Sequence, residues 1–281
     1  MSSTAPSKRQ RPTNSLPSGK GLLDWLKPIL ASSVGGKFLV AITGLMLSGF
    51  VVVHMVGNLQ IFLGPDAIND YAHKLKETGL LLWIARLGLL GVFLMHIGLA
   101  LRLRMRAHEA RPVPYAHEVT VQASFASRTM AYSGFVILAF VLFHIAHYTV
   151  GVIQPVPGPA EKKQADGDAK KPEGEPKKID DLPTPAKEIS LLQLTDSRGR
   201  HDVYRMMIIG FSNPLISGLY ILAQLALMMH LSHGIASTFQ SLGLNTPRLQ
   251  AAWTYFGWTI TLVVGGGNLA IVGAVWTGVL H

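Results

Sequence analysis

The chain contains no cysteine among its 281 residues. This absence excludes thiolate-held iron–sulfur clusters, cysteine zinc sites and covalently attached c-type haem. Charge is also scarce, since only 15% of the residues are Asp, Glu, Lys or Arg, whereas 49% are hydrophobic. Any metal that this protein holds must therefore be bound by imidazole or carboxylate.

The hydrophobic residues are gathered in five stretches. A helix needs roughly 20 mostly apolar residues to cross a bilayer, and each stretch reaches that length. We therefore predict an all-α polytopic membrane protein, a bundle of five transmembrane helices. The predicted spans I to V cover residues 37–63, 80–101, 128–153, 214–239 and 253–280. Glycines 265–267 in span V indicate a close helix approach or a kink.

Composition divides the rest of the chain. Residues 1–20 read as a disordered basic tail. Residues 21–153 hold spans I–III, with a possible interfacial helix at 22–30. Residues 154–188 are rich in Pro, Lys, Asp and Glu and are predicted to be a disordered insertion. Residues 189–281 hold spans IV and V.

The formal charge of +9 is what a membrane protein carries when its Lys and Arg set the orientation and contact lipid headgroups. It gives no reason to expect nucleic-acid binding. Lys and Arg collect before span I and between spans II and III, so the positive-inside rule puts the N-terminus in the cytoplasm and the C-terminus outside. The Lys-rich insertion would then lie outside. The rule tolerates this because long loops translocate largely regardless of charge.

Four histidines stand inside four different spans: His54, His96, His144 and His230. A polar side chain in hydrocarbon costs free energy unless it has a partner. Counting residues to the span ends at 1.5 Å per residue places His54 and His144 roughly 14 to 15 Å below the outer boundary. His96 and His230 lie at a comparable depth, roughly 12 to 14 Å, from the cytoplasmic side. Depth therefore predicts an outer pair, His54 with His144, and an inner pair, His96 with His230.

Two opposed imidazoles suit a bis-histidine b-type haem, which has no open coordination site and carries electrons. The spacing Gly44…His54 recurs as Gly134…His144. Both glycines fall in the inner layer, where a missing side chain would let a porphyrin edge approach the backbone. We therefore expect two b-type haems, with the four histidines as axial iron ligands.

Other residues are weaker candidates. His147 and His233 follow a predicted ligand by three residues, and His233 competes with His230 for ligation. Arg128 is an interfacial anchor or a partner for haem propionates. The main alternative from a different class is a transporter or proton channel lined by the histidines. The lack of Asp and Glu within the spans weakens that alternative.

Several motifs together resemble a known family. They are Thr43-Gly44-Leu45 with His54-Met55-Val56-Gly57-Asn58-Leu59-Gln60, Ala126-Ser127-Arg128-Thr129-Met130 with Gly134 and His144, Asp202-Val203-Tyr204 with Gly210-Phe211-Ser212-Asn213-Pro214, and the run from His230 through His233-Gly234 to Gly243. They resemble the cytochrome b membrane-anchor subunit of succinate dehydrogenases and fumarate reductases, in its single-chain, five-helix, dihaem branch. The resemblance covers about residues 35–280 except the insertion.

The resemblance implies the same ligand pairs as depth does. It favours His230 over His233, because the family's fourth ligand stands thirteen residues before a glycine, as His230 does before Gly243. It also implies a bacterial cytoplasmic membrane, flavoprotein and iron–sulfur partner subunits on the cytoplasmic face, and a quinone, menaquinone in this branch, as substrate. Some fumarate reductases of the branch carry a Glu at the position of Met228. The Met in place of this Glu favours succinate oxidation over fumarate reduction. The cytochrome b of another quinone-linked enzyme, such as a nitrate reductase or hydrogenase, is the alternative among redox proteins.

Overall fold

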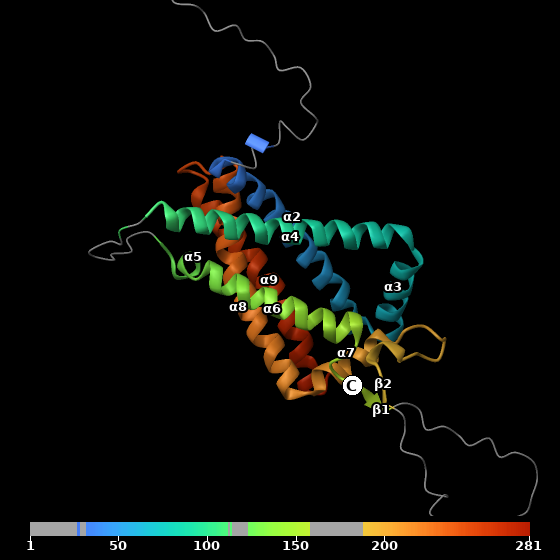
Figure 1. The fold of residues 1–281 in the computed structure, drawn as a ribbon. Coiled ribbons are helices and arrows are strands. Elements are labelled where there is room, and N and C mark those ends of the chain that lie inside the picture. Colours follow the sequence, from blue (N-terminus) through green and yellow to red (C-terminus); the bar gives the residue numbers. More distant parts are fainter. Residues whose placement is uncertain (1–26, 29–31, 112, 114–122, 158–187) are drawn as a thin grey trace, which may run out of the picture.

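The structure, a computed structural model, describes residues 27–28, 32–111, 113, 123–157 and 188–281. Within these ranges five helices are long and apolar enough to cross a membrane, as predicted (Figure 1). They are α2 (Ser33–Leu59), which a 3-10 turn η1 (Gln60–Leu63) continues, α4 (Leu80–Glu109), α6 (Met130–His144), which a π-helical turn η2 (Ile145–Val150) continues, α8 (Pro214–Ser241) and α9 (Gln250–Trp276).

Shorter elements lie at the ends of the bundle. They are α3 (Pro65–Glu77), α5 (Phe125–Arg128), the strands β1 (Val156–Pro157) and β2 (Glu188–Ile189), the 3-10 turn η4 (Leu191–Gln193) and α7 (Val203–Ser212). The two strands pair in antiparallel register, with Val156 opposite Ile189. This pairing lies at the margins of the predicted insertion, and residues 158–187 of that insertion fall outside the described ranges. So do residues 1–20 and most of the predicted interfacial helix at 22–30.

Local chemistry explains the helix ends that differ from prediction. α2 begins at Ser33, four residues early, because the Ser32 side chain caps it by accepting a hydrogen bond from the backbone N–H of Gly35 (2.9 Å). α4 continues eight residues past Leu101 to Glu109, since basic residues in a last helical turn interact favourably with the helix dipole. Span III is interrupted at Thr129 and ends at Gly151, whose φ of +73° is readily adopted by glycine. α8 begins at Pro214 as predicted, capped by Asn213.

The five long helices form a bundle in which α2 and α8 are central. α2 packs against α4 and α8, and α8 packs against α6 and α9. The packing order is therefore α4, α2, α8, α6, in which α8 separates α2 from α6 and α2 separates α4 from α8. We call α2 with α6 and α4 with α8 the diagonal pairs. α9 is one unbroken helix, and Gly265 and Gly267 serve its close packing. A Cβ on Gly265 would collide with the side chain of Met228, and one on Gly267 with that of Met55.

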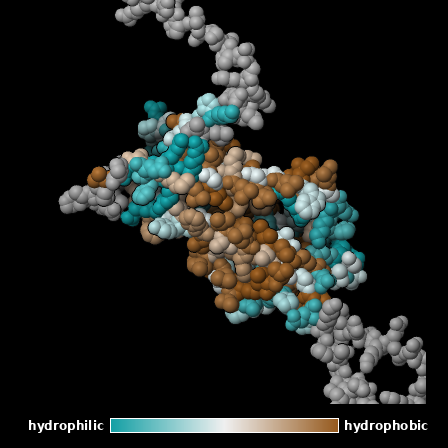
Figure 2. Space-filling model, in the orientation of Figure 1, coloured by the Kyte–Doolittle hydropathy of each residue, from teal (hydrophilic) through white to brown (hydrophobic). Residues whose placement is uncertain are grey.

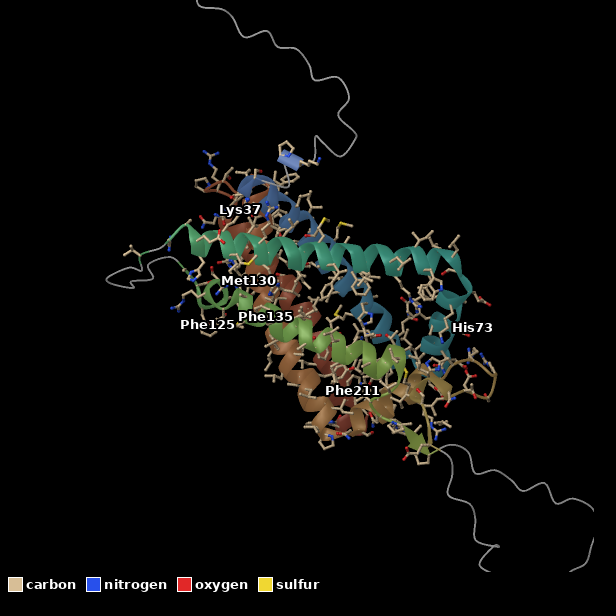
Figure 3. All side chains as sticks on the ribbon, viewed as in Figure 1. Lys37, His73, Phe125, Met130, Phe135 and Phe211 are labelled. Atoms are coloured by element: carbon tan, nitrogen blue, oxygen red, sulfur yellow. The ribbon has the colours of Figure 1, made fainter. Side chains whose placement is uncertain are left out.

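The surface agrees with a membrane location. Figure 2 shows a hydrophobic band across the middle of the visible face, with hydrophilic residues toward the two ends of the bundle. Large apolar side chains such as Leu87, Leu94 and Phe135 are exposed within the long helices. Figure 3 places Lys37 and Phe125 at one end and His73 and Phe211 at the other. Exposed apolar side chains along the middle and polar ends are what a lipid bilayer requires.

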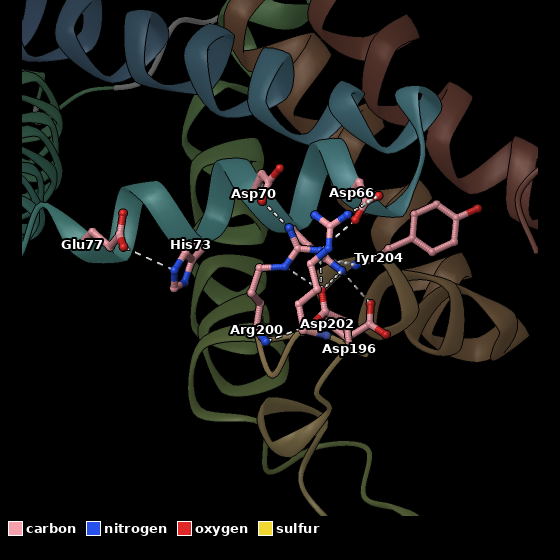
Figure 4. Close-up of polar contacts among 10 residues, drawn as sticks. Asp66, Asp70, His73, Glu77, Asp196, Arg200, Asp202 and Tyr204 are labelled. Atoms are coloured by element: carbon pink, nitrogen blue, oxygen red, sulfur yellow. Dashed lines mark hydrogen bonds and ion pairs between the residues drawn. The ribbon is translucent and has the colours of Figure 1, made fainter.

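A polar cluster ties α3 to the segment that leads into α7 (Figure 4). The guanidinium of Arg200, only 9% exposed, pairs with Asp66 (2.8 Å), Asp196 (2.6 Å) and Asp70. Asn69 is completely buried beside it; its amide donates to Asp202 (3.1 Å) and its carbonyl accepts from the backbone N–H of Tyr204 (3.1 Å). The cluster therefore joins the loop between the first two spans to the loop between the third and fourth.

Hydrogen bonds favour the charged forms of Asp196 and Arg200 at the centre of this cluster. Burial acts to raise the pKa of Asp196, but hydrogen bonds from the side chain and backbone of Arg200 and from the backbone of Arg198 outweigh it and hold that pKa below its usual value. Hydrogen bonds to Asp66 and Asp196 raise the pKa of Arg200. Because the pKa of Asp196 is lowered in the folded state, its stabilising contribution is present at neutral pH and is lost as the pH falls through that lowered pKa.

Asn69→Ala tests the cluster. The substitution leaves the backbone N–H of Tyr204 without its partner and removes the amide donor to Asp202. We expect the free energy of unfolding to fall by about 1 to 3 kcal/mol, seen as a lower midpoint of thermal unfolding in detergent by circular dichroism. His73→Ala, on the exposed side of the same helix, is the control and should change it by less than about 0.5 kcal/mol. Equal effects of the two substitutions would contradict the assignment.

Candidate functional site

The structure brings His54 and His144 together across the bundle. They belong to α2 and α6, a diagonal pair, and their ring centroids lie 5.8 Å apart with the planes nearly perpendicular, at 87°. A metal-bound imidazole nitrogen lies about 2 Å from the metal, so two rings on opposite sides of one metal have centroids on the order of 6 Å apart. The spacing of this outer pair fits that requirement.

His96 and His230 belong to the other diagonal pair, α4 and α8. Each is held by a hydroxyl. Nδ1 of His96 lies 3.0 Å from Oγ1 of Thr43, and Nδ1 of His230 lies 3.2 Å from Oγ of Ser133. Thr43 is on α2 and Ser133 on α6, so the two helices that carry the outer pair supply the partners of the inner pair.

The hydroxyl protons determine which nitrogen of each inner imidazole carries its hydrogen. Thr43 donates its proton to the backbone carbonyl of Leu39 (2.8 Å), and Ser133 donates to that of Met130 (3.0 Å). Each hydroxyl has a single proton, and while that proton is donated to the carbonyl the oxygen accepts from the histidine Nδ1–H. A neutral imidazole protonated at Nδ1 has its lone pair on Nε2, the atom that can bind a metal.

The outer pair shows the same preference at His54. The side-chain amide of Asn58, one turn further along α2, donates to His54 Nε2 at 3.2 Å, which requires the lone pair to be there. Phe50, one turn before, stacks on the ring with centroids 5.5 Å apart. Nδ1 of His144 lies 3.1 Å from the Tyr220 hydroxyl. All four predicted ligands are thus fixed by specific side chains of the bundle.

The two glycines of the sequence repeat lie beside the inner imidazoles. A Cβ built on Gly44 would stand 3.1 Å from Cε1 of His96, and one on Gly134 would stand 3.6 Å from Cε1 of His230. Each glycine follows the hydroxyl residue that holds the same ring, Thr43 or Ser133. The repeat is therefore a hydroxyl residue, a glycine and, ten residues after the glycine, a histidine of the other layer.

The weaker candidates are placed differently. His147 is completely buried, and both ring nitrogens have protein partners, the Tyr220 hydroxyl (3.0 Å) and the Gln154 side chain (3.1 Å). His233 is half-buried and makes no hydrogen bond with any residue of the described ranges. Arg128 is exposed at the last residue of α5, at the end of the bundle where α4 also ends (Figure 1). By contrast, none of the four predicted ligands is fully covered by protein.

Sequence reasoning missed the partners of these histidines. Thr43 and Ser133 could have been found from the sequence, because each directly precedes a glycine of the repeat. Only the glycines were assigned a role from the sequence. Tyr220 and Gln154 carry no such signal, because their contacts join residues 76 and 7 positions apart in the chain. Asn58 follows His54 by four residues, about one helical turn, and this spacing would have predicted that the two side chains are neighbours.

The donor set fits two bis-histidine haems. It consists of two diagonal imidazole pairs, with the lone pair on Nε2 in His96 and His230. In His54 the Nε2 lone pair accepts from Asn58, so the Asn58 amide would have to turn away for His54 to bind a metal. The two repeat glycines lie directly beside the inner imidazoles and leave room there. Met228, at the position that is Glu in some relatives of the resembled family, instead packs against Gly265. Comparisons of the chain with protein-family models, with curated proteins and with solved structures find no match.

Substitution of the two repeat glycines tests how tightly each packs on its histidine. Glycine to alanine in a helix normally stabilises by about 1 kcal/mol. Gly49→Ala should show this gain, because Gly49 is on α2 like Gly44 and its new Cβ would have no atom within 4 Å. Gly134→Ala should retain much of the gain, because its Cβ would be 3.6 Å from the His230 ring. Gly44→Ala should lose it, because the His96 ring must move. Thermal unfolding in detergent measures all three, and a gain at Gly44 equal to that at Gly49 would contradict the close approach.

Proposed function

We propose that this chain is the dihaem cytochrome b membrane subunit of a succinate dehydrogenase, a succinate:quinone oxidoreductase. The single observation that supports this most is the set of two histidine pairs on the two diagonal helix pairs of the bundle, each inner imidazole held at Nδ1 by a hydroxyl. The motif resemblance supplies the enzyme class. The chain itself would bind no dicarboxylate and would serve as anchor and electron carrier.

The residues of this chain would have distinct tasks. His96 and His230 would hold the haem nearer the cytoplasmic face, and His54 and His144 the haem nearer the outer face. When bound, these haems would supply one-electron Fe(III)/Fe(II) chemistry. The polypeptide would fix the imidazoles, exclude water with its apolar helices and keep the two centres at separate depths. This arrangement would carry electrons between an iron–sulfur subunit and a membrane quinone such as menaquinone.

The partners follow from the proposed orientation. The basic end of the bundle, near Lys37 and the end of α4, would face the cytoplasm by the positive-inside rule. Flavoprotein and iron–sulfur subunits would dock there, in a bacterial cytoplasmic membrane. The outer end would carry α3, α7 and the strand pair β1–β2.

Two other functions compete with this proposal. The cytochrome b of a nitrate reductase or hydrogenase would use similar histidine pairs, and the partner subunits that copurify with the intact complex distinguish it. A histidine-lined channel or transporter would bind no haem. Against a channel, the predicted spans I to V contain no Asp or Glu to relay protons.

Haem content is the first test of the proposal. The full chain, purified in detergent, should yield about two b-type haems in a pyridine haemochrome assay. In membranes that contain the intact complex, succinate should reduce these haems, seen in a reduced-minus-oxidised spectrum. A colourless chain would support the channel, and haems that succinate does not reduce would support another quinone-linked enzyme.

Single-histidine variants test the pairing. His54→Ala and His144→Ala should each remove the same haem and halve the haem content, since losing one axial ligand opens one of two sites. His96→Ala and His230→Ala should each remove the other haem. His233→Ala is the matched control and should retain both. Optical and paramagnetic resonance spectra identify the remaining haem, and loss of different haems by His54→Ala and His144→Ala would refute the pairing.

A further inference from the structure

A chain of hydrogen bonds runs from the outer histidine of α6 to the backbone of α7. Nδ1 of His144 lies 3.1 Å from the hydroxyl of Tyr220, and that hydroxyl lies 3.0 Å from Nδ1 of His147. Nε2 of His147 lies 3.1 Å from Oε1 of Gln154, whose amide nitrogen donates to the backbone carbonyl of Ile209 at 3.1 Å. Four hydrogen bonds thus connect the end of the third span, α6 with η2, to α8 and to α7.

The donors and acceptors along this chain can be assigned from its far end. A backbone carbonyl can only accept, so the amide NH₂ of Gln154 faces Ile209 and its oxygen faces His147. That oxygen must accept, so His147 is protonated at Nε2. The Nδ1 of a neutral His147 then has a lone pair and accepts the hydroxyl proton of Tyr220.

The assignment ends at His144. With its proton donated to His147, the Tyr220 oxygen can only accept, and it accepts from the Nδ1–H of His144. A neutral His144 then has its lone pair on Nε2. The outer histidine of α6 therefore has the same protonation as the two inner histidines, although no serine or threonine holds it.

We propose that Tyr220, His147 and Gln154 are positioning residues that form a relay from the Ile209 carbonyl and set the tautomer and ring orientation of His144. The assignment of protons is independent of the proposed function. Its consequence for a haem rests on that function. An Nδ1–H that donates to an acceptor makes an imidazole a more basic metal ligand, so the relay would stabilise the ferric form of the outer haem.

The surroundings of the relay support a dedicated role. It forms where α6 gives way to the π-helical turn η2, a type of turn that is frequent at functional sites. His147, in this turn, is fully buried, so each of its ring nitrogens depends on its protein partner and has no water to replace it. A second tyrosine, Tyr148, packs on His147 with ring centroids 4.0 Å apart, but its buried hydroxyl has no partner among the described residues.

Two tyrosine variants form a matched test. Tyr220→Phe and Tyr148→Phe each delete one buried hydroxyl from the same aromatic cluster, and only Tyr220 belongs to the relay. In the haem-loaded chain, Tyr220→Phe should raise the potential of the haem lost in His144→Ala by about 59 mV, a tenfold shift of a one-electron equilibrium. The other haem should keep its potential. Tyr148→Phe should leave both unchanged.

A second readout needs no haem. In the haem-free full chain labelled with ¹⁵N-histidine, the resonances absent from His144→Ala identify His144. They should show Nδ1 protonated in the unaltered chain and in Tyr148→Phe, and a mixture of both tautomers in Tyr220→Phe. Gln154→Leu, at the far and less buried end of the relay, frees His147 to reverse and should give a smaller shift in the same direction.

The outcomes separate the relay from the proposed function. A chain that binds no haem but shows the predicted change of tautomer keeps the relay and refutes the haem assignment. An Nε2-protonated His144 in the unaltered chain would overturn the relay. So would Tyr148→Phe changing the tautomer or the potential as much as Tyr220→Phe, because the tyrosines would then act through packing alone.

Discussion

The fold depends on one constraint at His96, His144 and His230: each of these imidazoles lies among apolar helices and needs a partner for its N–H group. Simple burial would not meet it, because hydrocarbon offers no acceptor. The bundle meets it at His96 and His230 with hydroxyls whose own protons are taken up by backbone carbonyls in the preceding turn. At His144 a tyrosine does the same work over a longer path. Each partner lies on a different helix from its histidine, so these bonds also determine which helices are neighbours.

The division of labour between helices follows from this constraint. α2 and α6 each carry an outer histidine and, one layer away, the hydroxyl and glycine that receive an inner histidine. α4 and α8 carry the inner histidines. A change in the rotation of α2 would therefore disturb both layers at once, because Thr43, Gly44 and His54 are placed by the same helix. This coupling explains why the repeated element comprises three residues, since a histidine alone would leave the opposite layer unsupported.

Hydropathy and length were enough to predict the five spans, and counting residues to the span ends paired His54 with His144, which the structure places 5.8 Å apart. The sequence could not predict the extent of α4 past its arginines, the interruption at Thr129 or the π-helical turn, because capping and tertiary packing determine these. The Arg200 cluster was also missed. Asn69 lies in the polar segment between spans I and II, yet it is completely buried. Its partners, Asp202 and Tyr204, lie more than 130 positions away in the chain, a distance over which periodicity carries no information.

The short strand pair at the margin of the insertion has a practical consequence. Val156 is opposite Ile189 and Pro157 is opposite Glu188, so the chain leaves and returns at neighbouring points, roughly 5 Å apart as in any paired strands. The number of residues between these points can therefore grow or shrink without moving η2 relative to α7. Evolution is free to vary that segment, and an experimenter could insert an affinity tag or a fluorescent domain there while the helices on either side keep their places.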